Sequence, residues 1–273
     1  MDAVTEKLRQ IRGLDVDAYD RAFLAKSFEK GRLVAGGGTA ADYLTRLSQD
    51  RAEAESFLRS LRVTYSEFFR NPLACALLEQ VILPSLVESA GTAGREIRVW
   101  SAGCAAGQEA WSVAMVLHEL AKARAHPVSF RIFATDISDE ALALARRGVY
   151  DLADVRNVRV KHFERFFTAT SQRCEIIPAL RDHVDFSAHD LLDERTTSPS
   201  ASVYGDFDLV LCSNVLLYYR PETQQRILGR LVGAARAGGW VVTGEAERDI
   251  VAHHPLLGQV APPATVFQKR SNA

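Results

Sequence analysis

The first group of residues that could do chemistry surrounds a turn rich in small residues. An apolar stretch, Ile97 to Ser101, is followed by Gly103 and Gly107, and then by a helix-forming run that contains Glu109. Glycines at a strand-to-helix turn let a ligand approach the backbone, and a helix N-terminus offers unpaired N–H groups. The pattern predicts a site for a nucleotide-like ligand, although a small-residue turn is equally common as packing between a strand and a helix. The glycine spacing does not fit the dinucleotide fingerprint, which argues against nicotinamide and flavin cofactors.

Two aspartates stand at the ends of the next apolar stretches. Asp136 closes RIFATD, at the carboxyl edge where open α/β sheets bind ligands, and its carboxylate can accept both hydroxyls of a ribose. The alternative, a helix-capping aspartate, is weakened because Ser138 already supplies the cap. Asp190 follows a third apolar stretch and could accept a hydrogen bond from an adenine amino group, or it could be a solvated loop residue.

Composition excludes several other classes of protein. The chain is 47% hydrophobic and 25% charged, and no apolar run approaches the roughly 20 residues of a membrane span, so a soluble protein without membrane insertion is expected. The N-terminus lacks an apolar signal region, which favours the cytoplasm. The four cysteines stand far apart, so they are expected to be thiols rather than metal ligands or disulfides. A net charge of −1 gives no sign of nucleic-acid binding.

The elements that position these residues fall into two parts. Residues 1–93 are expected to form a helical domain with a linker helix. Thr39 is a possible N-cap after a glycine run, and a further helix is expected to open at Asn71-Pro72. The residues assigned to the buried face of that helix are Leu77, Leu78, Val81 and Ile82.

Residues 94–273 read as a mostly parallel α/β domain. Short apolar strands alternate with amphipathic helices, and strands are expected at 97–101, 130–135, 183–187, 209–212 and 240–243. Arg220-Pro221 is expected to open a helix with an apolar stripe at Ile227, Leu228, Leu231 and Val232. Between about 150 and 187, β-prone stretches flank a polar turn and predict a small antiparallel appendage, and a polar loop at 193–206 is expected to be poorly ordered.

Six ordered motifs make the chain resemble the CheR-type chemotaxis receptor methyltransferases. They are YSEFFRNP, WSAGCAAGQEAWSVAM, FATDIS, the FERFF to HVDF stretch, HDLL and FDLVLCSNVLLYY. The resemblance implies a Rossmann-like α/β methyltransferase domain with a small antiparallel subdomain, preceded by an N-terminal helical domain. It also implies S-adenosyl-L-methionine as the cofactor, S-adenosyl-L-homocysteine as its product, and glutamate methyl esters on the cytoplasmic helical region of a chemoreceptor.

The resemblance assigns roles to particular residues. It implies that Glu109 binds the methionyl amino group, that Asp136 holds the ribose, and that Tyr218 is the active-site tyrosine. Arg70 is expected to contact the cofactor and to orient the acceptor carboxylate, for which a planar guanidinium is suited, although it could instead pair with acidic residues of the helical domain. The remaining positions expected to contact the cofactor are Thr64, Ser66, Gly103, Asp190, Leu191, Asn214 and Val215.

Two departures from the family pattern concern the acceptor more than the reaction. Ser213 stands where the family usually has arginine, and the closing G-H-S-E pattern is Gly244-Glu245-Ala246-Glu247 here. Another protein or a small molecule as methyl acceptor therefore remains an alternative, as does a non-catalytic module that senses the cofactor. Basic residues of the N-terminal region are offset by acidic ones, so a solvated helical face is the simpler account of those charges. A monomer without a metal is expected.

Overall fold

The computed structural model describes residues 2–11, 16–124, 126–202 and 205–271, and two compact units can be distinguished in it. The first unit comprises Met1–Val63 together with Leu216–Arg226, and the second comprises Thr64–Val215 together with Ile227–Ala273. This division differs from the expected boundary near residue 93. The helices between residues 72 and 93 belong to the second unit because their apolar residues pack into its core.

The first unit is helical. Its helices are α1 (Asp2–Gln10), α2 (Arg21–Val34), α3 (Ala40–Gln49) and α4 (Arg51–Ser60), together with a short 3-10 turn at Leu216–Tyr218 and the first residues of α11 (Pro221–Ala234). Gly36, Gly37 and Gly38 all have positive φ, which ends α2, and Thr39 then caps α3 in a capping box with Asp42, as expected. The core of this unit contains Leu8, Leu24, Phe28, Tyr43, Leu47, Phe57 and Leu61.

Ion pairs within the first unit account for many of its charges. Arg32 pairs with Glu29 at 2.8 Å, and Arg46 pairs with Glu53 at 2.9 Å. Arg9 pairs with both Glu6 and Asp17. These pairs support the interpretation of a solvated, charge-balanced helical surface rather than an uncompensated basic face.

The second unit is built on a seven-stranded sheet of order β6-β2-β1-β7-β8-β10-β9. Its strands are β1 (Ile97–Ala102), β2 (Phe130–Asp136), β6 (Val184–Ala188), β7 (Phe207–Cys212), β8 (Ala235–Thr243), β9 (Leu257–Gln259) and β10 (Val266–Lys269). The five strands from β6 to β8 are parallel, and β10 and β9 add antiparallel pairs at one edge. All five strands expected from the sequence are therefore confirmed, whereas β9 and β10 were not anticipated.

The helices of the second unit are α5 (Pro72–Leu77), α6 (Leu83–Ala93), α7 (Gln108–Lys122), α8 (Asp139–Arg147), α9 (Val160–Phe166), α10 (Pro178–Arg181) and α12 (Arg248–Ala252). The rest of α11 also belongs to this unit, and its expected apolar stripe is buried. Short 3-10 turns occupy Leu152–Val155 and Glu245–Glu247. Asn71 caps α5 and Pro72 is its first residue, as expected.

One expected core position is wrong. Val81 is 53% exposed, whereas Leu78 and Ile82 are buried and Leu77 packs against the core from its edge. A π-helical turn at Leu78–Ile82 lies between α5 and α6, just before Pro84. Because the extra residue in a π-turn shifts the helical phase, the apolar stripe does not continue through Val81.

The continuous helix Pro72–Ala93 is long and apolar enough, by length and composition, to cross a membrane. Its Leu78, Ile82, Leu83, Leu86, Val87 and Ala90 are part of the core of the second unit. A buried core helix meets the same criterion, so this feature is weak support for a membrane span. It also corrects the expectation from the sequence that no apolar stretch approaches that length.

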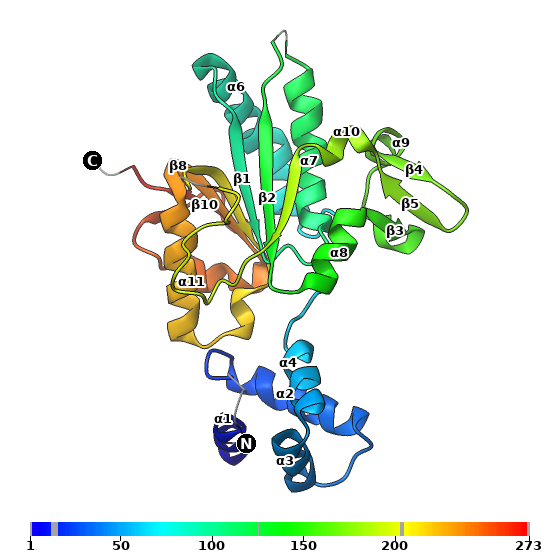
Figure 1. Cartoon of the computed structure of the whole chain (residues 1–273). Coiled ribbons are helices and arrows are strands. Elements are labelled where there is room, and N and C mark those ends of the chain that lie inside the picture. Colours follow the sequence, from blue (N-terminus) through cyan, green and yellow to red (C-terminus); the bar gives the residue numbers. More distant parts are fainter. Residues whose placement is uncertain (1, 12–15, 125, 203–204, 272–273) are drawn as a thin grey trace. The chain divides into compact units, whose positions relative to one another are not determined.

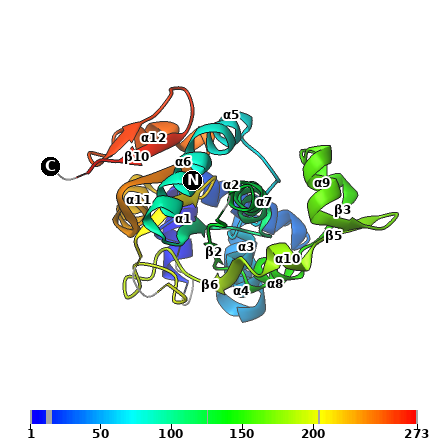
Figure 2. The ribbon, with the colours of Figure 1, turned by 90° about the horizontal axis from the view of Figure 1, so that it is seen from above.

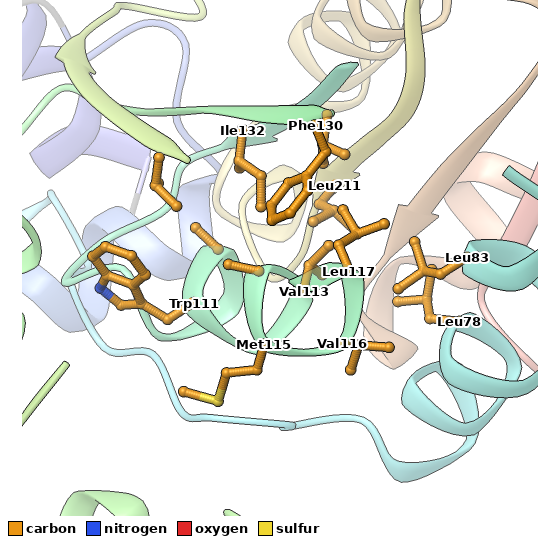
Figure 3. Close-up of a cluster of buried hydrophobic side chains, with 14 of the residues drawn as sticks. Leu78, Leu83, Trp111, Val113, Met115, Val116, Leu117, Phe130, Ile132 and Leu211 are labelled. Atoms are coloured by element: carbon orange, nitrogen blue, oxygen red, sulfur yellow. The ribbon is translucent and has the colours of Figure 1, made fainter. Parts of the chain in front are cut away.

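The core of the second unit is organised around α7. Figure 3 shows Val113 and Leu117 turned toward Phe130, Ile132 and Leu211 of the strands. All five are at most 4% exposed. Since α7 begins directly after the glycine turn, its packing on β2 and β6 holds the helix that starts at the candidate site against the sheet.

A second, three-stranded antiparallel sheet of order β3-β5-β4 stands to one side of the main sheet (Figures 1 and 2). It contains β3 (Val149–Asp151), β4 (Phe167–Ala169) and β5 (Arg173–Ile176), and with α9 it forms the expected antiparallel subdomain. The expected β-prone stretch FERF is helical and forms part of α9, so the strands flanking the polar turn are shorter than the sequence suggested. In the loop at 193–206, residues 203 and 204 lie outside the described residues.

Candidate cofactor site

The candidate site is the carboxyl edge of the parallel strands in the second unit. β1 lies between β2 and β7, and all three run in the same direction. The residues that follow these strands therefore meet at one edge, which is where ligands bind in open α/β sheets. This edge brings together the turn after β1, Asp136 at the end of β2, and Ser213 to Val215 after β7.

The turn after β1 is held against the end of β2. The N–H groups of Gly103 and Cys104 donate to the carbonyl oxygen of Thr135 at 2.8 and 2.9 Å, and φ is positive at Gly103, Ala105 and Gly107. A Cβ on Gly103 would lie 2.5 Å from Val215, and one on Gly107 would lie within about 3.1 Å of Phe186. The packing alternative therefore explains why both positions are glycine, and the argument for a ligand must come from the polar side chains around them.

Asp136 is 8% exposed and its carboxylate is fixed by two backbone donors. Ala105 N–H donates to Oδ2 at 2.9 Å, and Ser138 N–H donates to Oδ1 at 2.8 Å. Ser138 is the N-cap of α8, as expected, so Asp136 is not a capping residue. Each carboxylate oxygen has two acceptor positions, so this rigid carboxylate can also receive the two hydroxyls of a ribose.

Glu109 lies in the first turn of α7 and is a second carboxylate at this edge. Burial raises its pKa, and hydrogen bonds from Ser213 and Ser101 lower it. Glu247 raises it again through charge repulsion, and the charge of Arg70 makes a smaller contribution in the opposite direction. The Ser101 hydroxyl donates to Oε2 of Glu109 at 3.1 Å. An ammonium group beside Glu109 would compensate its charge, which fits the methionyl end of the expected cofactor.

Asn214 and Val215 follow β7 in a conformation that a distant residue maintains. Asn214 has a φ of 61°, and its N–H donates to Oε2 of Glu247 at 2.8 Å, as does the N–H of Gly244. A Cβ on Gly244 would lie 2.9 Å from the carboxamide of Asn214, so only glycine allows this approach. Glu247 is fully buried. This role of Glu247 was not predicted from the sequence, where the G-x-x-E spacing of Gly244 and Glu247 is the signal for it.

The loop after β6 brings Asp190 and Leu191 to the same edge. The N–H of His189 donates to the carbonyl oxygen of Asp136 at 3.1 Å, and Oδ1 of Asp190 accepts from Leu192 N–H at 2.8 Å. Arg230 of α11 donates to the carbonyl oxygen of Leu191 at 2.9 Å. Leu191 is buried and Asp190 is half-buried, which fits an apolar and an acceptor contact with an adenine.

The segment Thr64–Arg70 enters the second unit without regular structure. Arg70 is exposed, and its guanidinium carbon lies 5.4 Å from the ring centroid of Tyr65. Its charge acts on Glu109, so the structure brings these two expected site residues into one electrostatic environment. Thr64 is exposed and Ser66 is half-buried, and their contact with the cofactor stays a prediction.

Tyr218 belongs to the first unit. Its ring lies 4.9 Å from that of Phe23, and its carbonyl oxygen accepts from Asp20 N–H at 2.9 Å. These contacts fix the tyrosine within its own unit. Its catalytic role stays a prediction.

The four cysteines are free thiols, as expected. Cys104 and Cys212 stand at the carboxyl edge, and burial raises the pKa of each well above its ordinary value. Burial also raises the pKa of Cys75 to about 11. These thiols stay protonated at neutral pH, which does not favour a thiolate nucleophile at this site.

The comparisons with known proteins agree with this geometry. The family model described as "CheR methyltransferase, SAM binding domain" matches residues 64–259. Chemotaxis protein methyltransferase 1 of Pseudomonas aeruginosa is 36% identical over 70% of this chain and 69% of its own length. The chemotaxis protein methyltransferase of Salmonella typhimurium is 32% identical over 80% of this chain and 73% of its own length.

A third relative is an uncharacterised 104.1 kDa protein of Rhodobacter capsulatus. It is 34% identical over 75% of this chain, and the chain spans about a fifth (21%) of its length. The matched domain and the carboxylates at the strand ends identify S-adenosyl-L-methionine as the cofactor that this fold binds.

Proposed function

Since the chain belongs to the CheR methyltransferase family, we propose that this adenosylmethionine-dependent methyltransferase makes methyl esters of glutamate side chains on the cytoplasmic region of a chemoreceptor. The observation that carries the proposal is the pair of carboxylates formed by the buried Asp136 and the half-buried Glu109, which lie beside a glycine turn with Arg70 within electrostatic reach. Such an acceptor places the protein in the cytoplasm.

The chemistry fits the residues at this edge. Adenosylmethionine supplies an electrophilic methyl group, and a glutamate acceptor with an ordinary pKa of about 4.3 is already ionised, so no general base is needed. Burial raises the pKa of the cysteine thiols at this edge, so none of them supplies a competing thiolate. The protein has to bind adenosylmethionine and the glutamate, to align the carboxylate with the methyl group, and to exclude water.

Each carboxylate has its own part in binding. We assign Asp136 to the ribose hydroxyls and Glu109 to the methionyl ammonium. Asn214, held by Glu247, and Val215 contact the methionyl end, and Asp190 and Leu191 contact the adenine.

Arg70 is the residue we assign to the acceptor carboxylate. For Tyr218 we propose a catalytic role of its hydroxyl on the family resemblance alone. A guanidinium can hold a carboxylate through two parallel hydrogen bonds, which aligns one oxygen for attack. Arg70→Lys preserves the charge but loses the planar fork, so it separates orientation from simple attraction.

The test is transfer of a labelled methyl group from adenosylmethionine to purified chemoreceptor cytoplasmic fragments, followed by mild base. Glutamate methyl esters release labelled methanol in base, whereas N-methyl and ether groups do not. We expect base-labile label with the wild type and roughly 100-fold less with Arg70→Ala, as for loss of a charge-assisted bidentate contact. Absence of base-labile label on every fragment would reject the glutamate acceptor.

A second candidate function keeps the reaction and changes the acceptor. It is favoured by one observation, the hydrogen bond of Ser213 to Glu109 at a position where the family usually has arginine. Base-stable label on a component of a cell extract, with none on receptor fragments, would support this candidate over the first.

A further inference from the structure

The segment Thr64–Arg70 contacts the antiparallel subdomain through three consecutive side chains, those of Glu67, Phe68 and Phe69. The ring of Phe68, fully buried, packs edge-on against Tyr150 of β3 and Phe167 of β4, with centroid distances of 5.0 and 5.7 Å. The ring of Phe69 stacks on His162 of α9 at 5.5 Å. Glu67 accepts a hydrogen bond at 2.7 Å from Arg156, which lies between β3 and α9.

Glu67 connects this attachment to Arg70. Its Oε1 accepts from Arg156 and also from the hydroxyl of Tyr65. The hydrogen bond between Tyr65 and Glu67 raises the pKa of Tyr65 and lowers that of Glu67. The ring of Tyr65 in turn lies under the guanidinium of Arg70 at 5.4 Å. Arg156, Glu67, Tyr65 and Arg70 therefore form one continuous series of contacts.

The backbone of this segment needs such support. Phe69 has a φ of 49°, a left-handed conformation that is unfavourable for a residue with a bulky side chain. Its N–H donates to the hydroxyl of Ser112 in α7 at 3.1 Å, three residues beyond Glu109. The conformation that presents Arg70 is thus imposed from outside the segment, by α7 on one side and by the antiparallel subdomain on the other.

We propose that Arg156 is a positioning residue for Arg70: through Glu67 and Tyr65 it makes the geometry of the acceptor-binding arginine depend on the antiparallel subdomain. This inference rests on the role proposed above for Arg70. It adds a regulatory property, because anything that moves Arg156 changes the orientation of a guanidinium beside the cofactor site.

The chain offers a closely matched control. Arg159 pairs with Glu79 at 2.6 Å, and the two side chains are 56% and 18% exposed, against 68% and 22% for Arg156 and Glu67. Both pairs join the same part of the antiparallel subdomain to the rest of the second unit. Glu79 also lies 3.6 Å from Lys161, so it keeps one cation in Arg159→Ala. Only the Arg156 pair reaches the segment of Arg70, so the two alanine variants each remove one exposed arginine from a surface ion pair, with different expected consequences.

The experiment measures hydrogen exchange of the Phe68–Arg70 amides together with the steady-state kinetics of the full chain. In Arg156→Ala we expect exchange and kcat each to change by roughly 3- to 10-fold, exchange becoming faster and kcat lower, with KM for adenosylmethionine unchanged, because an exposed ion pair makes a modest contribution. Arg159→Ala should alter neither. Arg156→Lys keeps a cation beside Glu67 and leaves the hydrogen bond from Tyr65 to Glu67 in place, so it should recover most of both values.

Equal effects of Arg156→Ala and Arg159→Ala on exchange, no effect of either, or an Arg156→Lys variant as impaired as Arg156→Ala would overturn the proposal. Hydrogen exchange requires no methyl acceptor. A wild type that transfers no methyl group would therefore reject the proposed function, while the exchange comparison would still decide whether Arg156 holds the segment.

Discussion

Both ends of the main sheet hold buried carboxylates, but the groups that contact these carboxylates differ between the two ends. At the amino end, Asp208 of β7 is fully buried and is surrounded by cations. Its Oδ1 lies 2.8 Å from Arg95 and 2.6 Å from Arg236, and its Oδ2 accepts from the N–H of Arg98 at 2.9 Å. At the carboxyl end, Asp136, Glu109 and Glu247 are held mainly by backbone N–H groups and serine hydroxyls.

This difference separates a structural carboxylate from carboxylates prepared for a ligand. Two guanidinium groups balance the single charge of Asp208, so it has nothing to gain from a further cation. At the carboxyl end, burial and Glu247 both raise the pKa of Glu109, and the contribution of Arg70 is smaller. An excess of negative charge in a buried place is unfavourable in the free protein and becomes favourable when a cationic ligand binds.

The largest expected effect is on stability, from Asp208→Ala. Removal of the carboxylate leaves two arginines and one N–H without their shared partner, and we expect the free energy of unfolding to fall by about 3–5 kcal/mol. Urea denaturation measures this loss. Affinity for adenosylhomocysteine, measured by isothermal titration, should change by no more than about twofold because the sites are independent. A large loss of affinity would show that the two ends are coupled.

Asp136→Ala should mainly weaken cofactor binding, in contrast to Asp208→Ala, which should mainly lower stability. Loss of hydrogen bonds to a charged acceptor, each worth about 1.5–3 kcal/mol, should weaken binding of adenosylhomocysteine by roughly 100-fold. Isothermal titration measures the change, with Asp139→Ala as the control because Asp139 is exposed and begins the adjacent helix α8. Equal affinities of the two variants would remove Asp136 from the site.

Glu247→Ala tests the third carboxylate, which we expect to act on structure and binding together. The N–H groups of Asn214 and Gly244 would lose their acceptor, at a cost of about 2 kcal/mol in the free energy of unfolding. Cofactor affinity should fall as Asn214 leaves its left-handed conformation. Glu245→Ala, in the same 3-10 turn but exposed, should leave both measurements unchanged.

Glu109→Gln is expected to change stability and cofactor affinity least, and the direction of its change in stability is the informative result. Because the pKa of Glu109 is raised in the folded protein, its contribution to stability is fully present below its ordinary pKa of 4.5 and is lost as pH rises through the raised value. The glutamine variant should therefore have a higher Tm than the wild type at pH 7, and the difference should shrink toward pH 4. Binding of adenosylmethionine at pH 7 should weaken by about 10-fold, since the ammonium loses a charged partner.

Scanning calorimetry between pH 4 and pH 7 measures whether the glutamine variant has a higher or a lower Tm than the wild type. A glutamine variant that is less stable than the wild type at pH 7 would contradict the view that Glu109 is poised for a cation. In the wild type, affinity for adenosylmethionine should fall as the pH drops through the raised pKa of Glu109, because the protonated carboxyl no longer attracts the ammonium.

The parallel strands and their terminal carboxylates could be predicted because the signals are local. Short apolar runs mark strands whatever the rest of the chain does, and Gly103, Asp136 and Gly244 mark the ends of three of them. The cap at Ser138 and the helix start at Pro72 were predicted for the same reason. In contrast, β9 and β10 are only three and four residues long, and their strand character depends on pairing with β8 and with each other.

The sequence by itself determined the strand ends, the caps, the reduced cysteines and, through ordered motifs, the family and its cofactor. The tertiary structure alone decided which glycines serve packing, that Val81 is exposed beyond a π-turn, and that Glu247 holds Asn214. It also decided that Glu67 joins Arg156 to the segment of Arg70. These contacts join residues between 33 and 112 positions apart in the chain, or depend on a local change of helical phase. Neither periodicity nor spacing along the sequence reports such distances, because they are set by how the elements pack.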